Sequence, residues 1–162
     1  MQSIGIDLKR SIDEGLLKII ANRATLCGLE MHLVMAHTIV KEFKPSAVVI
    51  DPITTLIGAG LAVEAKAMLA RLLDFLKNEG VTVLATDLNI SADKDDATDI
   101  GISSLCDTWI RLLVETQGHQ RLRRIAIIKS RGMKHGQDEK NLEITDKGLE
   151  IKDITEKKAV NR

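Results

Sequence analysis

Apolar residues follow two different spacings along the first half of the chain. They recur at helical spacing over residues 6–14, 28–44 and 61–78, which predicts three helices. Gly15 ends the first of these helices and Pro45 ends the second. Shorter apolar runs, of a length typical of buried strands, lie between and after the helices at residues 16–20, 46–50 and 81–85.

The last third of the chain has the pattern of consecutive strands. Residues 107–116 and 121–129 are predicted to form two strands joined by a turn at Gln117-Gly118-His119. Residues 141–151 predict a further hairpin, which turns at Asp146-Lys147-Gly148. Strands separated by helices imply right-handed crossovers and a parallel sheet, whereas consecutive strands imply an antiparallel extension. We therefore expect an α/β fold.

Two polar segments, residues 87–99 and 152–162, lack a core pattern. The first is expected to be a mobile loop and the second a frayed tail, which leaves residues 1–151 as the folded domain. The acidic residues of the first segment lack the glycine and the terminal glutamate of a calcium loop, so we expect them to be solvated.

Bulk composition excludes several classes of function. The 162 residues suit one domain, and equal numbers of basic and acidic residues, 23 of each, argue against a general binder of nucleic acids or membrane surfaces. Cys27 and Cys106 stand far apart and outside any CxxC pair, which argues against a metal or disulfide framework and favours the cytoplasm. No signal-peptide pattern is visible, and no apolar stretch reaches the ~20 residues that span a bilayer.

Asp51 directly follows the apolar run Ala47-Val48-Val49-Ile50. Ligands of parallel α/β sheets bind at the carboxyl ends of the strands. In P-loop NTPases an aspartate at this place holds Mg²⁺ beside the nucleotide phosphates. The pattern is common, and the alternative is that Asp51 starts a turn with Pro52.

Four segments carry a more specific signal. They are CGLEMHLVMAHTIVKEFKPSAVVIDPITTL (27–56), AKAMLARLLDFLKNEGVTVLATDL (65–88), DIGISSLCDTWIRL (99–112) and IIKSRGMKHGQ (127–137). Together they resemble the KaiC family of RecA-like ATPases, some of which are Ser/Thr autokinases of circadian clocks. The resemblance covers residues 1–151. It implies a three-layer α/β/α fold with a mainly parallel sheet and antiparallel C-terminal strands, ATP and Mg²⁺ as cofactors, and assembly with itself or with full-length KaiC-type subunits.

The resemblance also implies roles for individual residues. Asp51 matches the Walker B carboxylate, a metal ligand, while Ser103 and Ser104 match the phospho-acceptor hydroxyls of the clock kinases. Lys129 and Arg131, in the sequence KSRG, match a pair that reaches the γ-phosphate of ATP on the neighbouring subunit, as an arginine finger does. Other positions match residues around the nucleotide at the same subunit boundary: Arg123, Ser130, Met133, His135, Thr145 and Asp146.

The chain departs from the family pattern in its phosphate-binding loop. No GxxxxGK(S/T) motif occurs in these residues, and Gly58-Ala59-Gly60 has no Lys-Thr behind it. In the family this loop and an adjacent pair of catalytic glutamates lie upstream of the residue matching Met1. We therefore expect a domain incomplete at its N-terminus, with little or no ATPase activity alone. Asp87 replaces a small or hydroxyl residue of the relatives, which weakens a sensor role for Thr86.

Without the strand that leads into this loop, two strands of the sheet are expected to lack a neighbour. By resemblance, the strand that leads into it would lie between strands 81–85 and 107–116. Edge strands with unpaired N–H and C=O groups pair with something or aggregate. We expect these two strands either to pair with each other or to recruit another chain.

Plainer alternatives remain for the polar residues. Ser103 and Ser104 have the alternative role of a cap or turn, and Lys129 and Arg131 that of a solvated strand end. A basic cluster could contact DNA, as RecA relatives do, but charge runs on exposed strands are usually solvated, and nucleic-acid binding is not expected. The cluster consists of Arg121, Arg123 and Arg124.

Three functions stay open. The chain is part of a ring-forming ATPase, with or without autokinase activity in signalling or timing. Alternatively, it is a degenerate KaiC-like module that docks on a full-length ring and completes a neighbour's ATP site. The third possibility is a non-functional remnant or a truncated gene product.

Overall fold

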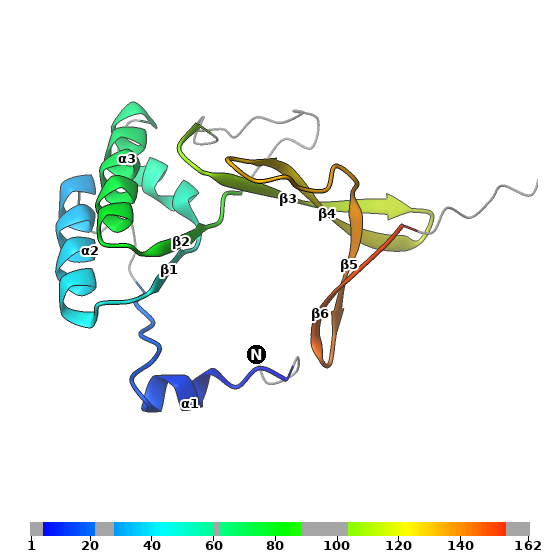
Figure 1. Ribbon diagram of the computed structural model, residues 1–162, viewed down its shortest axis with the longest axis horizontal. Coiled ribbons are helices and arrows are strands. Elements are labelled where there is room, and N and C mark those ends of the chain that lie inside the picture. The colour runs from blue at the N-terminus through cyan, green and yellow to red at the C-terminus, as the bar shows by residue number, and fades with distance from the viewer. Residues whose placement is uncertain (1–4, 22–27, 60–61, 89–103, 155–162) are drawn as a thin grey trace, which may run out of the picture. The chain divides into compact units, whose positions relative to one another are not determined.

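The computed structural model describes residues 5–21, 28–59, 62–88 and 104–154. The chain divides into two compact units, and each is described by itself (Figure 1). The helical unit comprises residues 21–106, and the sheet unit comprises residues 1–20 together with 107–162.

The helical unit contains a parallel pair of strands. Its elements are α2 (Leu29–Phe43), β1 (Ala47–Ile50), the 3-10 helix η3 (Ile53–Ala59), α3 (Ala62–Asn78) and β2 (Thr82–Ala85). β1 and β2 run parallel and in register, from Ala47 opposite Thr82 to Ile50 opposite Ala85. The two helices and both strands lie where the apolar pattern predicts them.

The core of this unit lies under one face of α3. Helical spacing predicts that the core face consists of Ala62, Ala65, Leu69, Leu72, Leu73 and Leu76. Of these residues, Ala65, Leu69, Leu72 and Leu76 are buried and Leu73 is half-buried, whereas Ala62 is exposed and Met68 joins the core. Burying a leucine side chain stabilises a fold by roughly 1.5–3 kcal/mol. The core also contains residues from the rest of the unit: Leu29, Val40, Ile53 and Val81.

Both α-helices of this unit are followed within two residues by a residue in the left-handed conformation. Lys44 closes α2 with φ 49° and donates its backbone N–H to the carbonyl of Val40, at 2.8 Å. Pro45 then prevents the helix from continuing. Gly80 follows α3 with φ 73° and donates its N–H to the carbonyl of Lys77.

Helices cover one face of the β1–β2 pair in the described part of the chain. Val48, Ile50 and Val83 pack against the core, whereas Val49 and Leu84 on the other face are 65% and 58% exposed. Parallel strands are normally covered on both faces. The described residues therefore supply one of the two helical layers that the predicted fold requires.

The sheet unit is an antiparallel sheet. Its strands are β3 (Thr108–Gln117), β4 (Gln120–Ser130), β5 (Lys140–Thr145) and β6 (Gly148–Lys152), in that order across the sheet, and α1 (Leu8–Asp13) precedes them. The predicted turns are confirmed at Gly118 and at Asp146-Lys147. β6 includes Lys152, so the strand extends into the segment predicted to be a polar tail.

The exposed apolar side chains of this sheet share one face. The pairing of Leu113 with Arg124 and of Arg124 with Asn141 fixes which residues lie together on the other, mainly polar face. Seven large side chains on the apolar face are at least 36% exposed: Ile110, Leu112, Val114, Ile127, Ile144, Leu149 and Ile151. An apolar surface of this kind is typical of a face that packs against another structure.

One strand prediction is wrong, and one branch of a second prediction is excluded. Residues 16–20 form no strand, and their apolar side chains Leu16 and Ile19 are 72% and 64% exposed, because this short run finds no strand partner. β2 and β3 do not pair with each other among the described strands, since they belong to separate sheets. Recruitment of another chain remains the open alternative.

The fold class is confirmed as α/β, with a parallel and an antiparallel part that fit a partial RecA-like fold. The described parallel part has 2 strands and the antiparallel part has 4. None of the helices in the described ranges is both long enough and apolar enough to cross a membrane.

Candidate functional site

Asp51 lies at the carboxyl end of β1, beside the end of β2. The residue after β2, Thr86, donates a hydrogen bond from its hydroxyl Oγ1 to the Asp51 carboxylate oxygen Oδ1. The Thr86 backbone N–H also bonds to the carbonyl of Ile50 at 3.0 Å, and its carbonyl accepts from the N–H of Ile53 at 2.9 Å. These contacts hold Asp51 at the edge where parallel α/β sheets bind ligands.

The end of β4 carries the second group of candidate residues. Lys129 and Ser130 are its last residues, and Arg131 follows them. The Arg131 backbone N–H donates to the carbonyl of Asp107 at 2.8 Å, and its guanidinium lies 3.7 Å from the Asp107 carboxylate. The hydroxyls of Thr108 and Ser130 lie 2.8 Å apart. The start of β3 therefore holds this strand end by backbone and side-chain contacts.

An irregularity in the β3–β4 pairing determines the face from which Lys129 projects. Ile110 lies opposite Ile127, whereas Trp109 lies opposite Lys129, so Ile128 is one extra residue on β4. If Ile128 were paired in regular alternation, Lys129 would lie on the same face as Ile127, two positions earlier. The β-bulge instead places Lys129 with Trp109, on the face opposite the exposed apolar side chains, and bulges commonly redirect side chains next to functional sites.

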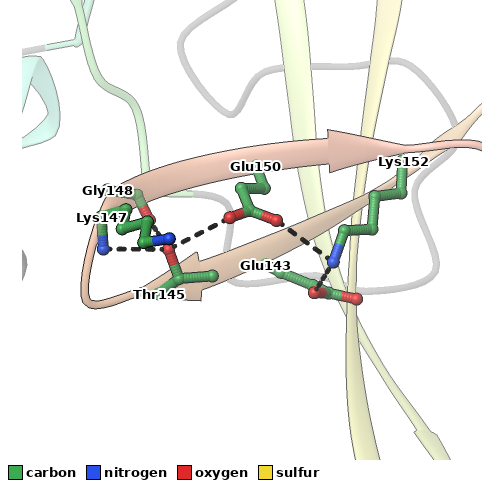
Figure 2. Close-up of polar contacts among 6 residues, drawn as sticks. All are labelled: Glu143, Thr145, Lys147, Gly148, Glu150 and Lys152. Atoms are coloured by element: carbon green, nitrogen blue, oxygen red, sulfur yellow. Dashed lines mark hydrogen bonds and ion pairs between the residues drawn. The ribbon is translucent and has the colours of Figure 1, made fainter.

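The β5–β6 hairpin contains Thr145 and Asp146, and Figure 2 shows the polar contacts around its turn. The Thr145 hydroxyl accepts from the Lys147 backbone N–H at 3.1 Å and lies 3.2 Å from the Gly148 carbonyl. The turn thus uses the Thr145 hydroxyl for its own structure. A Cβ on Gly5, whose φ is 72°, would lie 3.1 Å from the Asp146 carbonyl, so the N-terminal segment packs closely on this turn.

The polar face of the hairpin is charged. Lys152 pairs with Glu143 and, at 3.2 Å, with Glu150 (Figure 2). The hydrogen bond to Glu143, followed by that to Glu150, raises the pKa of Lys152. Lys140 similarly pairs with Asp153, and the hydrogen bond lowers the pKa of Asp153.

The structure does not bring all the candidate residues together. Arg123 and Lys129 are six residues apart on β4, about 20 Å along an extended strand. Arg123 pairs with Val114 on the apolar face, whereas Lys129 lies on the opposite face. Within one chain these two residues therefore do not face the same ligand. Met133 and His135 follow in the segment after β4, where Met133 is 67% exposed and the His135 ring lies 3.0 Å from the Gly136 carbonyl.

The serine pair can be placed only in part. Ser103 lies outside the described residues. Ser104 is exposed, in a short 3-10 turn before β3.

Residues 1–156 match the sequence profile of the family described as "ATPase: KaiC". The chain belongs to this KaiC family. It is 39% identical over 154 residues to the circadian clock protein KaiC2 of Synechocystis, and 31% identical over 149 residues to KaiC3 of the same organism. The circadian clock oscillator protein KaiC of Synechococcus elongatus is 32% identical over 154 residues.

These matches cover 93%, 91% and 93% of this chain, respectively. They cover 27%, 29% and 29% of the relatives. The chain therefore spans less than a third of the length of the KaiC-type relatives that it matches. It corresponds to a partial KaiC-like module.

The KaiC-type chain uses three residues at these sites that the motif match did not select. The departure at Asp87 weakens a sensor role for Thr86, yet Thr86 contacts Asp51 directly. Asp107 and Thr108 hold the KSRG end. The available signal was a polar pair, Asp107 and Thr108, at the start of the strand that pairs with the KSRG strand. Only the register between the two strands shows that this pair meets Ser130 and Arg131.

The basic cluster predicted on β4 needs a correction. Arg124 is 8% exposed, its Nε lies 3.4 Å from the Glu115 carboxylate, and its guanidinium contacts Asn141. Successive residues of a strand face opposite sides, so Arg124 is buried while Arg121 and Arg123 are exposed. This reduces the solvent-facing basic cluster to two residues.

The residues at the β1 end fit a limited role in binding Mg²⁺. No group of three or more His, Cys, Asp or Glu side chains within the described ranges could hold a metal ion. Mg²⁺ beside nucleotides is commonly held by one or two carboxylates, with water and phosphate oxygens completing its shell. Asp51 can supply one such carboxylate, and Thr86 orients it.

Proposed function

We propose that this chain forms part of a KaiC-type ATP site, to which it supplies Lys129 and Arg131 in trans. The triphosphate is held by the P-loop of a neighbouring full-length subunit. Asp51 is the Walker B carboxylate, a Mg²⁺ ligand, of this chain's own site, for which these residues contain no P-loop motif, and the partial domain spans residues 1–151. The placement of Lys129 and Arg131 at the end of β4, where β3 holds them, carries the proposal.

The chemistry of the two cations suits a transferring phosphoryl group. Arginine presents a planar fork of donors that bonds two phosphate oxygens at once, whereas lysine is a compact point charge. Charge on the phosphoryl oxygens is stabilised by such cations, and an arginine finger supplied by a neighbour can raise the rate of hydrolysis by about 10³–10⁵. The Arg131 side chain is 56% exposed, so a ligand of another subunit can reach it.

The isolated chain is expected to hydrolyse little ATP. Backbone N–H groups and the lysine of a P-loop cradle the β- and γ-phosphates in this class of ATPase. The 162 residues contain no GxxxxGK(S/T) sequence. ATP and Mg²⁺ are therefore expected to bind at a boundary with another subunit, in the cytoplasm, where Ser103 and Ser104 are the candidate phospho-acceptors.

A complementation experiment tests this function. A full-length KaiC-family ATPase such as the Synechocystis KaiC2 is prepared with alanine at the two positions aligned with Lys129 and Arg131. Adding this chain is expected to restore ATP hydrolysis. The double substitution Lys129→Ala/Arg131→Ala in this chain is expected to lower the restored rate at least about tenfold. Lys134→Ala, which removes a nearby exposed cation, is the matched control and should restore hydrolysis fully.

Two outcomes would contradict the proposal. Restoration by the doubly substituted chain would show that Lys129 and Arg131 are not the groups supplied. Failure of the unmodified chain to raise the rate at any mixing ratio would show that it does not complete the neighbour's site.

The exposed apolar surface favours a second candidate, a docking module without a catalytic contribution. Val49 and Leu84 are 65% and 58% exposed on the uncovered face of the β1–β2 pair. Association with a full-length ring, or with a second copy of the chain, would bury such a surface. Sedimentation of the mixture separates the two functions, because a docking module binds the ring and leaves its ATPase rate unchanged.

A further inference from the structure

We propose that Asp107 is a positioning residue that directs Arg131 toward the triphosphate. This inference rests on the proposed trans-acting function. Asp107 directly precedes β3, and Arg131 directly follows β4, so the two residues extend the antiparallel pair by one step. The family match did not assign any role to Asp107.

Asp107 contacts Arg131 in two chemically different ways. Its backbone carbonyl accepts the Arg131 N–H at 2.8 Å, which fixes the main chain just past the strand. Its side-chain carboxylate lies 3.7 Å from a terminal guanidinium nitrogen of Arg131, which restricts the direction of the arginine. The backbone contact does not involve the Asp107 side chain, so it remains when that side chain is substituted. The ion pair can therefore be removed by itself.

The neighbouring pairs make the strand end a firm base for the arginine. The Thr108 and Ser130 hydroxyls meet at 2.8 Å, one step inside the Asp107–Arg131 pair. Trp109 lies opposite Lys129 in the next pair, where the β-bulge begins. A long side chain such as Arg131 therefore starts from a fixed main chain, and Asp107 limits the rotamers beyond it.

The Arg131–Asp107 ion pair is weak enough for a triphosphate to replace Asp107 as the partner of the guanidinium. The side chains of Arg131 and Asp107 are 56% and 55% exposed. Ion pairs this exposed change an equilibrium by a factor of only about two to five. A triphosphate carries several charges and accepts bidentate hydrogen bonds from arginine, so it competes effectively for the guanidinium. Asp107 thus orients Arg131 before the nucleotide arrives without neutralising it permanently.

Asp107→Asn in this chain, assayed by complementation, tests the proposal. The variant keeps the backbone carbonyl and loses the charge. We expect the kcat of restored hydrolysis to fall about two- to fivefold at low salt. The KM for ATP should stay the same or decrease, because a negative charge near the phosphate site is removed. Asp107→Glu, which keeps the carboxylate, should restore most of the kcat.

Salt and nuclear magnetic resonance give readouts that a merely structural role would not change. The difference in kcat between the unmodified chain and Asp107→Asn should shrink as ionic strength rises from about 0.05 M to about 0.5 M, since salt screens exposed charges. In the isolated chain, the ¹⁵N heteronuclear NOE at the Arg131 Nε should fall in Asp107→Asn while the amide spectrum of the β-strands is retained. This second measurement does not require any ATPase activity.

The outcomes separate this inference from the proposed function. If Arg131→Ala leaves restored hydrolysis unchanged, the trans-acting function itself fails. If Arg131→Ala abolishes restoration but Asp107→Asn matches the unmodified chain in kcat and in the Arg131 NOE, the positioning role of Asp107 is overturned. A rise in KM with unchanged kcat would also overturn it, because that result indicates a binding contact rather than a positioning one.

Discussion

The Thr86 hydroxyl donates a hydrogen bond to the Asp51 carboxylate and so joins the ends of two parallel strands 35 residues apart in sequence. Because β1 and β2 pair in register, the residues that follow them reach the same sheet edge together. This pairing gives the carboxylate a fixed direction. Thr86 therefore orients the Asp51 carboxylate at this edge of the sheet.

Replacing Thr86 with valine should destabilise the helical unit modestly. The substitution preserves the shape of the side chain and removes the donor to Asp51. We expect the free energy of unfolding, measured by urea titration, to fall by about 0.5–1.5 kcal/mol. Thr86→Ser, which retains the hydroxyl, is the control and should lose less. Equal stability of Thr86→Val and the unmodified chain would show that the contact has no net value.

Insertion of one residue in β3 between Trp109 and Ile110 should remove the bulge in β4. The inserted residue would pair with Ile128, so the strand would continue in simple alternation and Lys129 would move to the face of Ile127. Complementation of the ATPase should be lost, while far-ultraviolet circular dichroism should still show the β-sheet. Ile128→Val keeps the bulge and should retain complementation. Full complementation by the insertion variant would mean that the bulge does not determine the direction of Lys129.

Arg124 and Arg123 should respond differently to substitution by alanine, although they are adjacent in sequence. Arg124 is buried against Glu115 and Asn141, so its loss removes both packing and hydrogen bonds. We expect Arg124→Ala to lower the free energy of unfolding by about 2–3 kcal/mol, and Arg123→Ala to change it by less than about 0.5 kcal/mol. Similar small values for both would contradict the burial of Arg124.

The Lys140–Asp153 pair should make stability depend on pH at both extremes. The hydrogen bond from Lys140 lowers the pKa of Asp153 below its ordinary value of 3.8. Its stabilisation is therefore present above pH 3.8 and is lost as the pH falls through the lower pKa of the folded chain. The pKa of Lys140 is raised above 10.5, so its contribution is present below that pH and is lost only at higher pH.

Melting temperatures of the unmodified chain and of Asp153→Asn test this pair. The unmodified chain should melt at a slightly higher temperature at pH 7, and the difference should vanish at acidic pH, once Asp153 is protonated. Both groups are solvent-exposed, so high salt should also reduce the difference. A difference that persists unchanged in acid would assign it to another cause.

The sequence predicted elements well where a segment's own pattern determines its structure. The α3 face is an example, because helical spacing alone selects Leu69, Leu72 and Leu76. Residues 16–20 show the limit of this reasoning: a strand also requires a partner, and an apolar run does not reveal whether one exists. The bulge at Ile128 and the Asp107–Arg131 contact depend on the register between two strands, which no single segment encodes.

The central claim is that another subunit supplies the P-loop that holds the triphosphate. Thermal unfolding of this chain with and without Mg²⁺-ATP tests it most directly. Binding to the folded state raises the melting temperature. We predict no appreciable rise for the isolated chain at millimolar Mg²⁺-ATP. A clear, saturable rise that persists in Lys129→Ala/Arg131→Ala would place a complete ATP site within these residues and contradict the account.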